Sequence, residues 1–390
     1  MHCKEKFASI YNREPQDVAF CPYRICPLGA HIDHQNGIVT GLAIDKGINI
    51  AYSPKQNGVI ELCSMQFDKR AQWHVKSVPD EKQNDCADYL RGATLNLSQK
   101  YMLKVGLCGV IEGELPIGGL SSSAAVIIAF LTALCRVNGI TLTESEMIAM
   151  AQTAENKYVG VSCGKLDQSC EVFSKKDKLL YLDTKNGEFN LISTNPNMKP
   201  YKIAIFFSGV ERVLTKSNYN LRVDECRACA YSLLAFNGDE YSLVSKTSLR
   251  DVPYEVYLKH KDKLPLKWQK RAEHYYSECN RVKKGVELWE NGDIKGFGKL
   301  IFESGFSSIN NYETGSPELI ELFTILTQTK GVYGARFSGA GYKGCCMALI
   351  DPEETANIKQ EVEKRYLEKF PNLKGKYSAH ICESADGVKL

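Results

Sequence analysis

Residues 113–125, GELPIGGLSSSAA, constrain the fold of this chain more than any other segment. Pro116 disfavours a helix before it, and Gly118 and Gly119 permit backbone conformations that other residues resist. The three serines lead into the apolar run at residues 124–134, so they stand where a helix exposes its first unpaired N–H groups. Such a helix start binds anions, for example a nucleotide phosphate. Equally, the serines could merely cap a buried helix, and this segment alone leaves both interpretations open.

The size and charge of the chain indicate two domains and a small-molecule partner. A chain of 390 residues is too long for one small core. Its 49 basic and 46 acidic residues leave a net charge of +3, and no dense Lys/Arg tract concentrates it, so we expect no nucleic-acid partner. The apolar run at residues 124–134 is shorter than the roughly 20 residues of a membrane span, so we expect no membrane insertion. Nothing in the sequence indicates the oligomeric state.

The cysteines indicate a reducing compartment. There are fifteen of them, an odd number, scattered along the chain. Residues 1–10 are charged and do not resemble a secretory signal, so we expect free thiols and a cytoplasmic location. Cys226 and Cys229 form a CxxC pair in a helical stretch without a second Cys/His pair at zinc spacing, so we interpret them as structural.

Helical and strand patterns are interleaved along the chain, which favours α+β or α/β layers over a bundle or a sandwich. Strands are predicted at residues 39–52 and 58–63, and a hairpin turns at Asn186-Gly187. Helices are predicted near residues 88–101, 123–137, 144–158, 218–236, 267–290, 293–308 and 316–328. The linker candidate is NPNMKP at residues 195–200, so we place an N-terminal lobe at residues 1–195 and a C-terminal lobe at residues 196–390.

Three further segments are rich in groups that bind polar ligands. Residues 23–37, YRICPLGAHIDHQNG, suit the recognition of a polyol, although a polar surface loop has a similar composition. Residues 155–168 carry two acids, Glu155 and Asp167, whose spacing suits one acid on a metal and one beside a nucleophile. Residues 334–346, GARFSGAGYKGCC, hold four glycines that permit close approach of the backbone to a ligand, but hairpins use the same residues.

Together with residues 113–125, these segments resemble, in order and content, the three signatures of the GHMP small-molecule kinases, and within them the galactokinase branch. The stretches SNYNLRVDEC, RAEHYYSE and SSINNYETGSPEL extend the resemblance over nearly the whole chain. The resemblance implies an α+β fold of two lobes, with mixed sheets and helices and with the active site in the cleft between the lobes. It also implies ATP and Mg²⁺ as cofactors and a sugar as the acceptor.

The resemblance assigns roles to individual residues. Asp167 is expected to face the anomeric hydroxyl as catalytic base or orienting group, with Arg24 beside it. Ser123 and Glu155 correspond to magnesium ligands. The positions implied for the nucleotide are Pro116, Gly118, Gly119, Leu120, Ser121, Ser122, Ser123, Gly339 and Gly341, and those implied for the sugar are Ala30, His31, Asp33, Gly164 and Tyr219.

Three departures from the galactokinase pattern bear on specificity. Galactokinases carry a glutamate where this chain has Ala30, and that glutamate hydrogen-bonds the 6-hydroxyl of the sugar. A glutamate about 4 Å from a sugar carboxylate would oppose it by roughly 4 kcal/mol at an effective dielectric near 20, and Ala30 removes that barrier. Cys86 stands at the position of a tryptophan near the adenine, which leaves base recognition open. Lys165 stands where the family usually has an apolar residue. Its side chain either binds the carboxylate of the substrate or points to solvent, and we favour solvent.

The first and third signatures resemble those of galacturonokinases more closely than those of galactokinases. The favoured hypothesis is therefore an ATP-dependent 1-kinase of D-galacturonate that yields galacturonate 1-phosphate and ADP. An alternative keeps the reaction and changes the sugar to galactose or another hexose. A non-catalytic sugar sensor is a third hypothesis, less favoured because such sensors lose part of the Ser-Ala stretch that is intact at residues 121–125.

Overall fold

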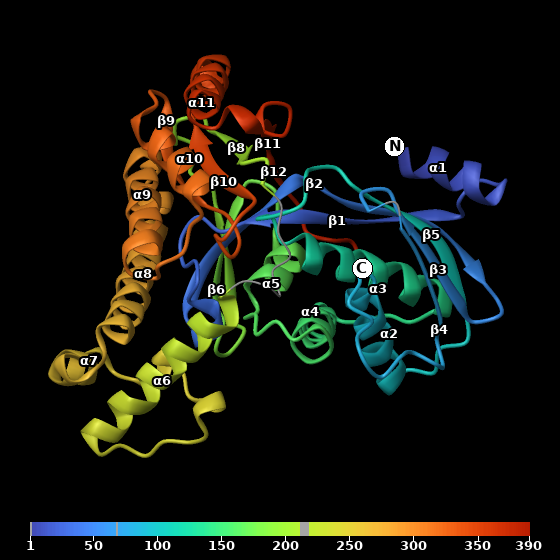
Figure 1. Ribbon diagram of the computed structural model, residues 1–390, viewed down its shortest axis with the longest axis horizontal. Coiled ribbons are helices and arrows are strands. Elements are labelled where there is room, and N and C mark those ends of the chain that lie inside the picture. Colours follow the sequence, from blue (N-terminus) through green and yellow to red (C-terminus); the bar gives the residue numbers. More distant parts are fainter. Residues whose placement is uncertain (1, 68, 211–217) are drawn as a thin grey trace.

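The computed structural model describes residues 2–67, 69–210 and 218–390, and it contains two β-sheets with helices packed against them (Figure 1). The larger sheet has eight strands and is built around the long strand β2 (Ile38–Lys55). Its main path runs in the order β4-β3-β5-β2-β6-β7, and β1 and β12 also pair with β2. The strands of this sheet are β1 (Asp17–Ile25), β2, β3 (Val59–Ser64), β4 (Lys69–His74), β5 (Gly106–Gly113), β6 (Lys178–Asp183), β7 (Phe189–Ser193) and β12 (Ser384–Ala385).

The smaller sheet has four antiparallel strands in the order β11-β8-β10-β9. These strands are β8 (Lys202–Phe207), β9 (Val332–Phe337), β10 (Cys345–Ile350) and β11 (Ser378–Cys382). The chain passes from the larger sheet to the smaller between β7 and β8, and it returns to the larger sheet with β12. We propose the lobe division at residues 195/196, as the sequence predicts, because it falls in this passage.

Helices cover the sheets on the faces where apolar side chains alternate along the strands. Ala51 of β2 and Val110 of β5 face α1 (His2–Tyr11), whereas their neighbours Ile50 and Ile111 face the main core. In Figure 1, helices α2 to α5 lie together along the larger sheet, and α10 and α11 lie beside the smaller one. The remaining helices are α2 (Asp88–Lys100), α3 (Ser122–Asn138), α4 (Glu144–Thr153), α5 (Leu166–Phe173), α6 (Tyr219–Asn237), α7 (Tyr254–His260), α8 (Leu266–Glu290), α9 (Ile294–Asn310), α10 (Pro317–Gln328) and α11 (Thr355–Lys369).

The predicted elements are present within a few residues of their expected ends, with one difference of type. A single helix was expected over residues 144–158, but α4 ends at Thr153 and continues as a wider π-type turn, η2 (Ala154–Val159). The turn closes at Gly160, whose left-handed backbone (φ 87°) lets the N–H groups of Gly160 and Val161 both bond the carbonyl of Glu155. Such turns are frequent at functional sites, and this one holds a predicted metal ligand. Within the described ranges, no helix combines the length and apolarity that crossing a bilayer requires.

Helix α9 lies so close to β9 that only glycines fit at the contact. A Cβ atom on Gly298 would lie 2.0 Å from the carbonyl oxygen of Tyr333, and one on Gly334 would lie 2.3 Å from the carbonyl oxygen of Gly298. Because both obstacles are backbone atoms, the elements would have to separate to admit a methyl group. One of the four glycines of the third signature therefore serves this packing.

We expect Gly298→Ala to lower the free energy of unfolding by about 2 kcal/mol or more, because the added methyl overpacks the α9–β9 contact. Urea denaturation with an unchanged m value would measure the change. Lys299→Ala, an exposed neighbour on the same helix, is the control and should differ from the wild type by less than about 0.5 kcal/mol. Equal stability of Gly298→Ala and the control would contradict the packing argument.

Candidate active site

The loop before α3 presents an open helix N-terminus. Gly118 (φ 122°), Gly119 (φ 88°) and Ser121 (φ 58°) all have left-handed backbones that bring the chain into the helix. Ser121 is the N-cap residue, yet its side chain makes no capping hydrogen bond, and its buried Oγ has no partner among the described atoms. No acidic residue lies in the first turn of α3. A buried hydroxyl and free helix N–H groups fit an anion better than they fit the alternative of serine caps.

The third signature packs against this loop backbone to backbone. A Cβ on Gly344 would lie 2.6 Å from the carbonyl carbon of Gly118, and one on Gly339 would lie 2.9 Å from the carbonyl oxygen of Gly119. Gly341 lies against Thr314, whose hydroxyl donates to the carbonyl of Ala340 (3.1 Å). These glycines therefore pack against the loop at residues 116–121, which is called the phosphate loop below after its predicted role, and they hold it in position.

Arg24 joins three elements of the site. Its Nε donates to Oδ1 of Asp167 (2.7 Å), and its Nη2 lies 2.6 Å from the same oxygen. Its Nη1 donates to the carbonyl of Gly119 in the phosphate loop (3.3 Å). Arg24 is 3% exposed; burial alone would lower its pKa, but the Asp167 carboxylate raises it instead. The guanidinium is thus permanently charged and fixes the first turn of α5 beside the phosphate loop.

Glu155 and Ser123 are close enough to share a hydrogen bond between their side chains. Glu155 is 4% exposed and accepts a hydrogen bond from Nε2 of Gln168 (2.5 Å). Burial, and then the negative charge of Asp167, raises the pKa of Glu155 to about 7, while hydrogen bonding to Ser123 opposes the rise. Among the described residues no group of three or more His, Cys, Asp or Glu side chains could hold a metal. A hydroxyl and one carboxylate suit Mg²⁺, which takes its other ligands from phosphates and water.

The polar segment at residues 29–36 folds into a strained loop. This loop places the carboxyl group of Asp33 against Gly164, which lies just before α5. His31 (φ 62°) and Asn36 (φ 57°) have left-handed backbones. A Cβ on Gly164 would lie 2.4 Å from Oδ2 of Asp33, so only glycine lets the two segments approach. Burial, and then the charge of Asp167, raises the pKa of Asp33 to about 6. The alternative of a polar surface loop does not fit this burial, and the recognition of a polyol by this segment stays a prediction.

Aromatic rings surround the same loop. The ring of His31 stacks on Tyr312 at 4.6 Å, and Nε2 of His31 is buried without a hydrogen-bond partner among the described atoms. Burial lowers the pKa of His31 well below its usual range, so the imidazole is neutral. Tyr219, the first residue of α6, lies edge-on to His34 at 6.0 Å. The unpartnered nitrogen of His31 is available to a ligand.

A buried ion network holds the backbone at Ala30. His274 bonds the carbonyl of Ala30 through Nε2 (3.0 Å), and the N–H of Gly29 donates to Glu278 (2.8 Å). Glu278 is itself paired with Arg281 (2.6 Å) and lies 3.7 Å from Arg336, with both Glu278 and Arg336 fully buried. These charges compensate one another, so they fix the loop without presenting a free carboxylate there.

Sequence reasoning did not single out His274, Glu278, Tyr312 or Arg336. The first three lie in the stretches RAEHYYSE and SSINNYETGSPEL, which carried the resemblance but no spacing that marks a site. Two positions predicted for the nucleotide differ in burial, because Leu120 is in the core and Pro116 is exposed. Their roles stay predictions.

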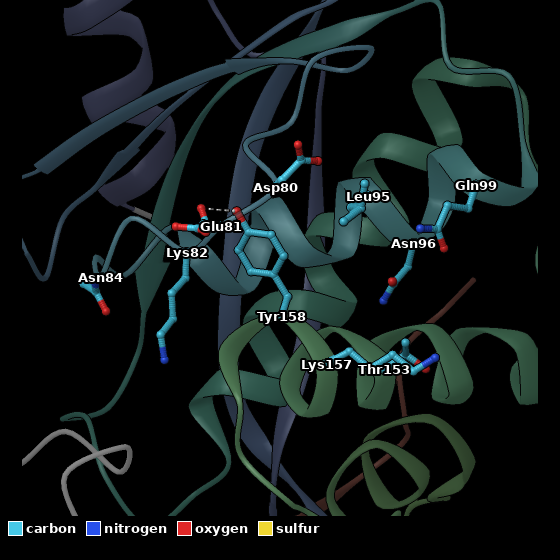
Figure 2. Close-up of a pocket in the computed structure, with 10 residues that line it drawn as sticks. All are labelled: Asp80, Glu81, Lys82, Asn84, Leu95, Asn96, Gln99, Thr153, Lys157 and Tyr158. Carbon is cyan, nitrogen blue, oxygen red and sulfur yellow. Dashed lines mark hydrogen bonds between the residues drawn. The ribbon is translucent and has the colours of Figure 1, made fainter.

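Two cavities lie near the elements that carry the predicted site residues. The larger, about 560 Å³, lies between α2 and the α4–η2 segment, and the hydroxyl of Tyr158 donates to the carbonyl of Glu81 at its edge (3.2 Å; Figure 2). It holds none of the predicted site residues. The smaller, about 350 Å³, is lined by Asp33, Gly164 and Lys165 among others. We therefore give weight to the smaller cavity, where the predicted chemistry lies.

Comparison with known families identifies this class of protein. The chain matches the GHMP kinases N-terminal domain over residues 88–175, the GHMP kinases C-terminal model over residues 286–368, and the galactokinase galactose-binding signature over residues 5–54. The chain belongs to the GHMP kinase family, in its galactokinase branch. The predicted family and the predicted fold are thereby confirmed.

Individual relatives refine the comparison. The galacturonokinase of Arabidopsis thaliana is 40% identical over 99% of this chain and 97% of its own length. The galactokinase of Staphylococcus carnosus is 31% identical over 99% and 98%. The crystal structure of Lactococcus lactis galactokinase complexed with galactose superposes with a TM-score of 0.89 at 27% identity, covering 99% of this chain and 98% of that one. The mevalonate kinase of Methanococcus jannaschii, at 16% identity and a TM-score of 0.66, shares the fold.

The raised pKa of Asp33 predicts an acid limb in sugar binding. As the pH falls through about 6, Asp33 takes up a proton and loses a carboxylate acceptor, so the KM for the sugar should rise while the KM for ATP changes less. Initial rates at saturating ATP between about pH 5 and pH 8 would measure it. Asp33→Asn is the matched control, with a high KM that does not vary in this range. An acid limb of equal size in both proteins would contradict the assignment.

Proposed function

We propose that this protein is an ATP-dependent kinase that phosphorylates the anomeric hydroxyl of D-galacturonate and yields galacturonate 1-phosphate and ADP. One observation carries the proposal: Arg24 bonds both the acid that faces the acceptor, Asp167, and the backbone of the phosphate loop at Gly119. A single buried cation thereby places a candidate base and a candidate phosphate cradle side by side, as phosphoryl transfer requires.

The phosphate side of the reaction uses the loop and the first turn of α3. The backbone N–H groups there, with the Ser121 hydroxyl, would bind phosphate oxygens, and Ser123 and Glu155 would hold Mg²⁺. Bound Mg²⁺ neutralises phosphate charge during transfer. Gly339 and Gly341 would border the nucleotide through the same packed loops.

The acceptor side uses Asp167 and its neighbours. Asp167, held by Arg24, would accept the hydrogen bond of the anomeric hydroxyl, as catalytic base or orienting group, and direct its oxygen at the γ-phosphate. Arg24 would offset the charge that develops on the transferred group. Asp33, Gly164 and Tyr219 would hold the ring hydroxyls, since they meet at the smaller cavity or beside it.

Selection of the uronic acid follows from the position of Ala30. Ala30 brings no charge to a loop whose Gly29 N–H is bound by Glu278, a buried acid that is already paired with arginine. A C6 carboxylate beside residue 30 would therefore meet no unpaired carboxylate from that residue or from Glu278, and the neutral imidazole of His31, in the tautomer with its proton on Nε2, would donate a hydrogen bond to it. The printed name of the 40% identical relative supports the same sugar. Lys165 lines the cavity next to Gly164, half-buried, and stays a second candidate for the carboxylate.

Two other functions remain as alternatives. A galactokinase activity is favoured by the names of the other relatives but not by Ala30. A non-catalytic sensor is opposed by the intact phosphate loop and both acids. We also propose a reducing location such as the cytoplasm, because all fifteen cysteines are unpaired in the structure.

The purified protein should release ADP from ATP and Mg²⁺ faster with D-galacturonate than with D-galactose or D-glucuronate at equal concentration. Asp167→Asn should lower kcat by at least about 100-fold while ATP binding, measured by calorimetry, is retained. Preference for galactose would favour the galactokinase alternative. Sugar binding without turnover of any of the three would favour the sensor, and undiminished turnover of Asp167→Asn would overturn the assignment of that acid.

A further inference from the structure

Glu171 is a buried acid for which the proposed chemistry has no role. It lies in α5 with 0% exposure, and neither carboxyl oxygen has a hydrogen-bond partner among the described residues. Buried side-chain oxygens almost always have such a partner, and an acid with two unpartnered oxygens is rarer still. Glu171 lies after the segment at residues 155–168, and the resemblance assigns it no role.

The position of Glu171 relates it to the Arg24–Asp167 pair. It follows Asp167 by four residues in α5, so the two acids share one face of the helix, one turn apart. Helix α5 packs on β1, the strand that carries Arg24. The C-terminal segment closes this end of the helix, because the N–H of Val388 donates to the carbonyl of Glu171 (2.8 Å) and that of Gly387 donates to the carbonyl of Ser174 (2.7 Å).

The charges around Glu171 disfavour its ionised form. Among the described residues, Arg24 of β1 acts on it as a positive group, whereas Asp167 of the same helix and Glu155 of η2 are negative. Cys21 and Tyr23 of β1 and Cys170 of α5 are the other titratable neighbours, and burial raises the pKa of each. Burial, and then Asp167, raises the pKa of Glu171 well above its usual range. A carboxylate there would lack both water and donors.

We propose that Glu171 is a positioning residue, held as the neutral acid behind the Arg24–Asp167 pair, and that its ionisation slows phosphoryl transfer. As the neutral acid, Glu171 does not attract the guanidinium of Arg24, so the positive charge of Arg24 acts on Asp167 and on the incoming phosphoryl group. When its proton passes to solvent at higher pH, the carboxylate competes with Asp167 for the guanidinium and adds negative charge where negative charge develops in the reaction. The kinetic part of this inference rests on the proposed kinase function.

Glu171→Gln, which is permanently neutral and of nearly the same shape, tests the proposal kinetically. Near pH 7 its kcat should lie within about threefold of the wild type, whereas the fall in wild-type kcat at alkaline pH that ionisation of Glu171 causes should be absent from the variant. Glu144→Gln, an exposed acid at the start of α4, is the control and should keep the wild-type profile. Loss of more than about 100-fold at every pH in a folded Glu171→Gln, or a profile that superposes on the wild type, would overturn the proposal.

A second measurement needs no activity, so it separates failure of this inference from failure of the kinase proposal. Infrared difference spectra between the wild type and Glu171→Gln at neutral pH should show the C=O stretch of a protonated carboxyl in the wild type alone. Carboxylate bands in its place would show that Glu171 is ionised and would overturn the proposal. Thermal melting of both proteins confirms that the comparison is between folded chains, and Glu171→Asp serves as a second acid variant if Glu171→Gln does not fold.

Discussion

The hydrogen-bonded ion pair between Arg24 and Asp167 is the interaction on which the rest of the site depends. It joins β1 to the first turn of α5, and through the carbonyl of Gly119 it also reaches the phosphate loop. Breaking a buried pair by removing one partner leaves an uncompensated charge, at a cost of several kcal/mol. The pair therefore fixes the position of Asp167 relative to the loop at Gly119, and it places a positive charge between them. Glu171 lies one turn after Asp167 in α5. As the neutral acid we propose, it does not compete with Asp167 for the charge of Arg24.

The second constraint is the contact between the two glycine-rich loops. Gly118 and Gly119 meet Gly344 and Gly339 backbone to backbone, so the phosphate loop from one half of the chain rests on the turn between β9 and β10 from the other half. Larger residues at these positions would separate the loops and move the open N-terminus of α3 away from Asp167. The glycines in residues 113–125 and those in residues 334–346 are thus needed for the packing of one loop on the other.

The sequence predicted the elements and the family but not the contacts that organise the site. The helix ranges followed from the apolar periodicity, and the structure shows local caps at two of their ends, Gly139 after α3 and the Thr143–Glu146 capping box before α4. The catalytic roles predicted for Arg24 and Asp167, and the magnesium-binding roles predicted for Ser123 and Glu155, came from the resemblance. The π-type turn at Glu155 was missed because its register depends on burial of that side chain, which periodicity does not contain. The network of His274, Glu278 and Arg336 was missed because it forms only through tertiary packing. His274 and Glu278 lie one turn apart on α8, but Arg336 and the loop at Ala30 that they contact lie more than 50 residues away in sequence.

The central claim is that this kinase accepts a uronic acid because residue 30 carries no charge, and a charge placed at that residue tests it most directly. We would measure kcat/KM for D-galacturonate and D-galactose in the wild type, in Ala30→Glu and in Ala30→Gln, which has the size of the glutamate without its charge. Repulsion of roughly 4 kcal/mol at 4 Å predicts that Ala30→Glu lowers kcat/KM for galacturonate by about 1,000-fold. The same variant should lower kcat/KM for galactose far less. Ala30→Gln should lower kcat/KM for galacturonate by less than about tenfold. Equal losses in the glutamate and glutamine variants, or an unchanged ratio between the two sugars, would contradict the account.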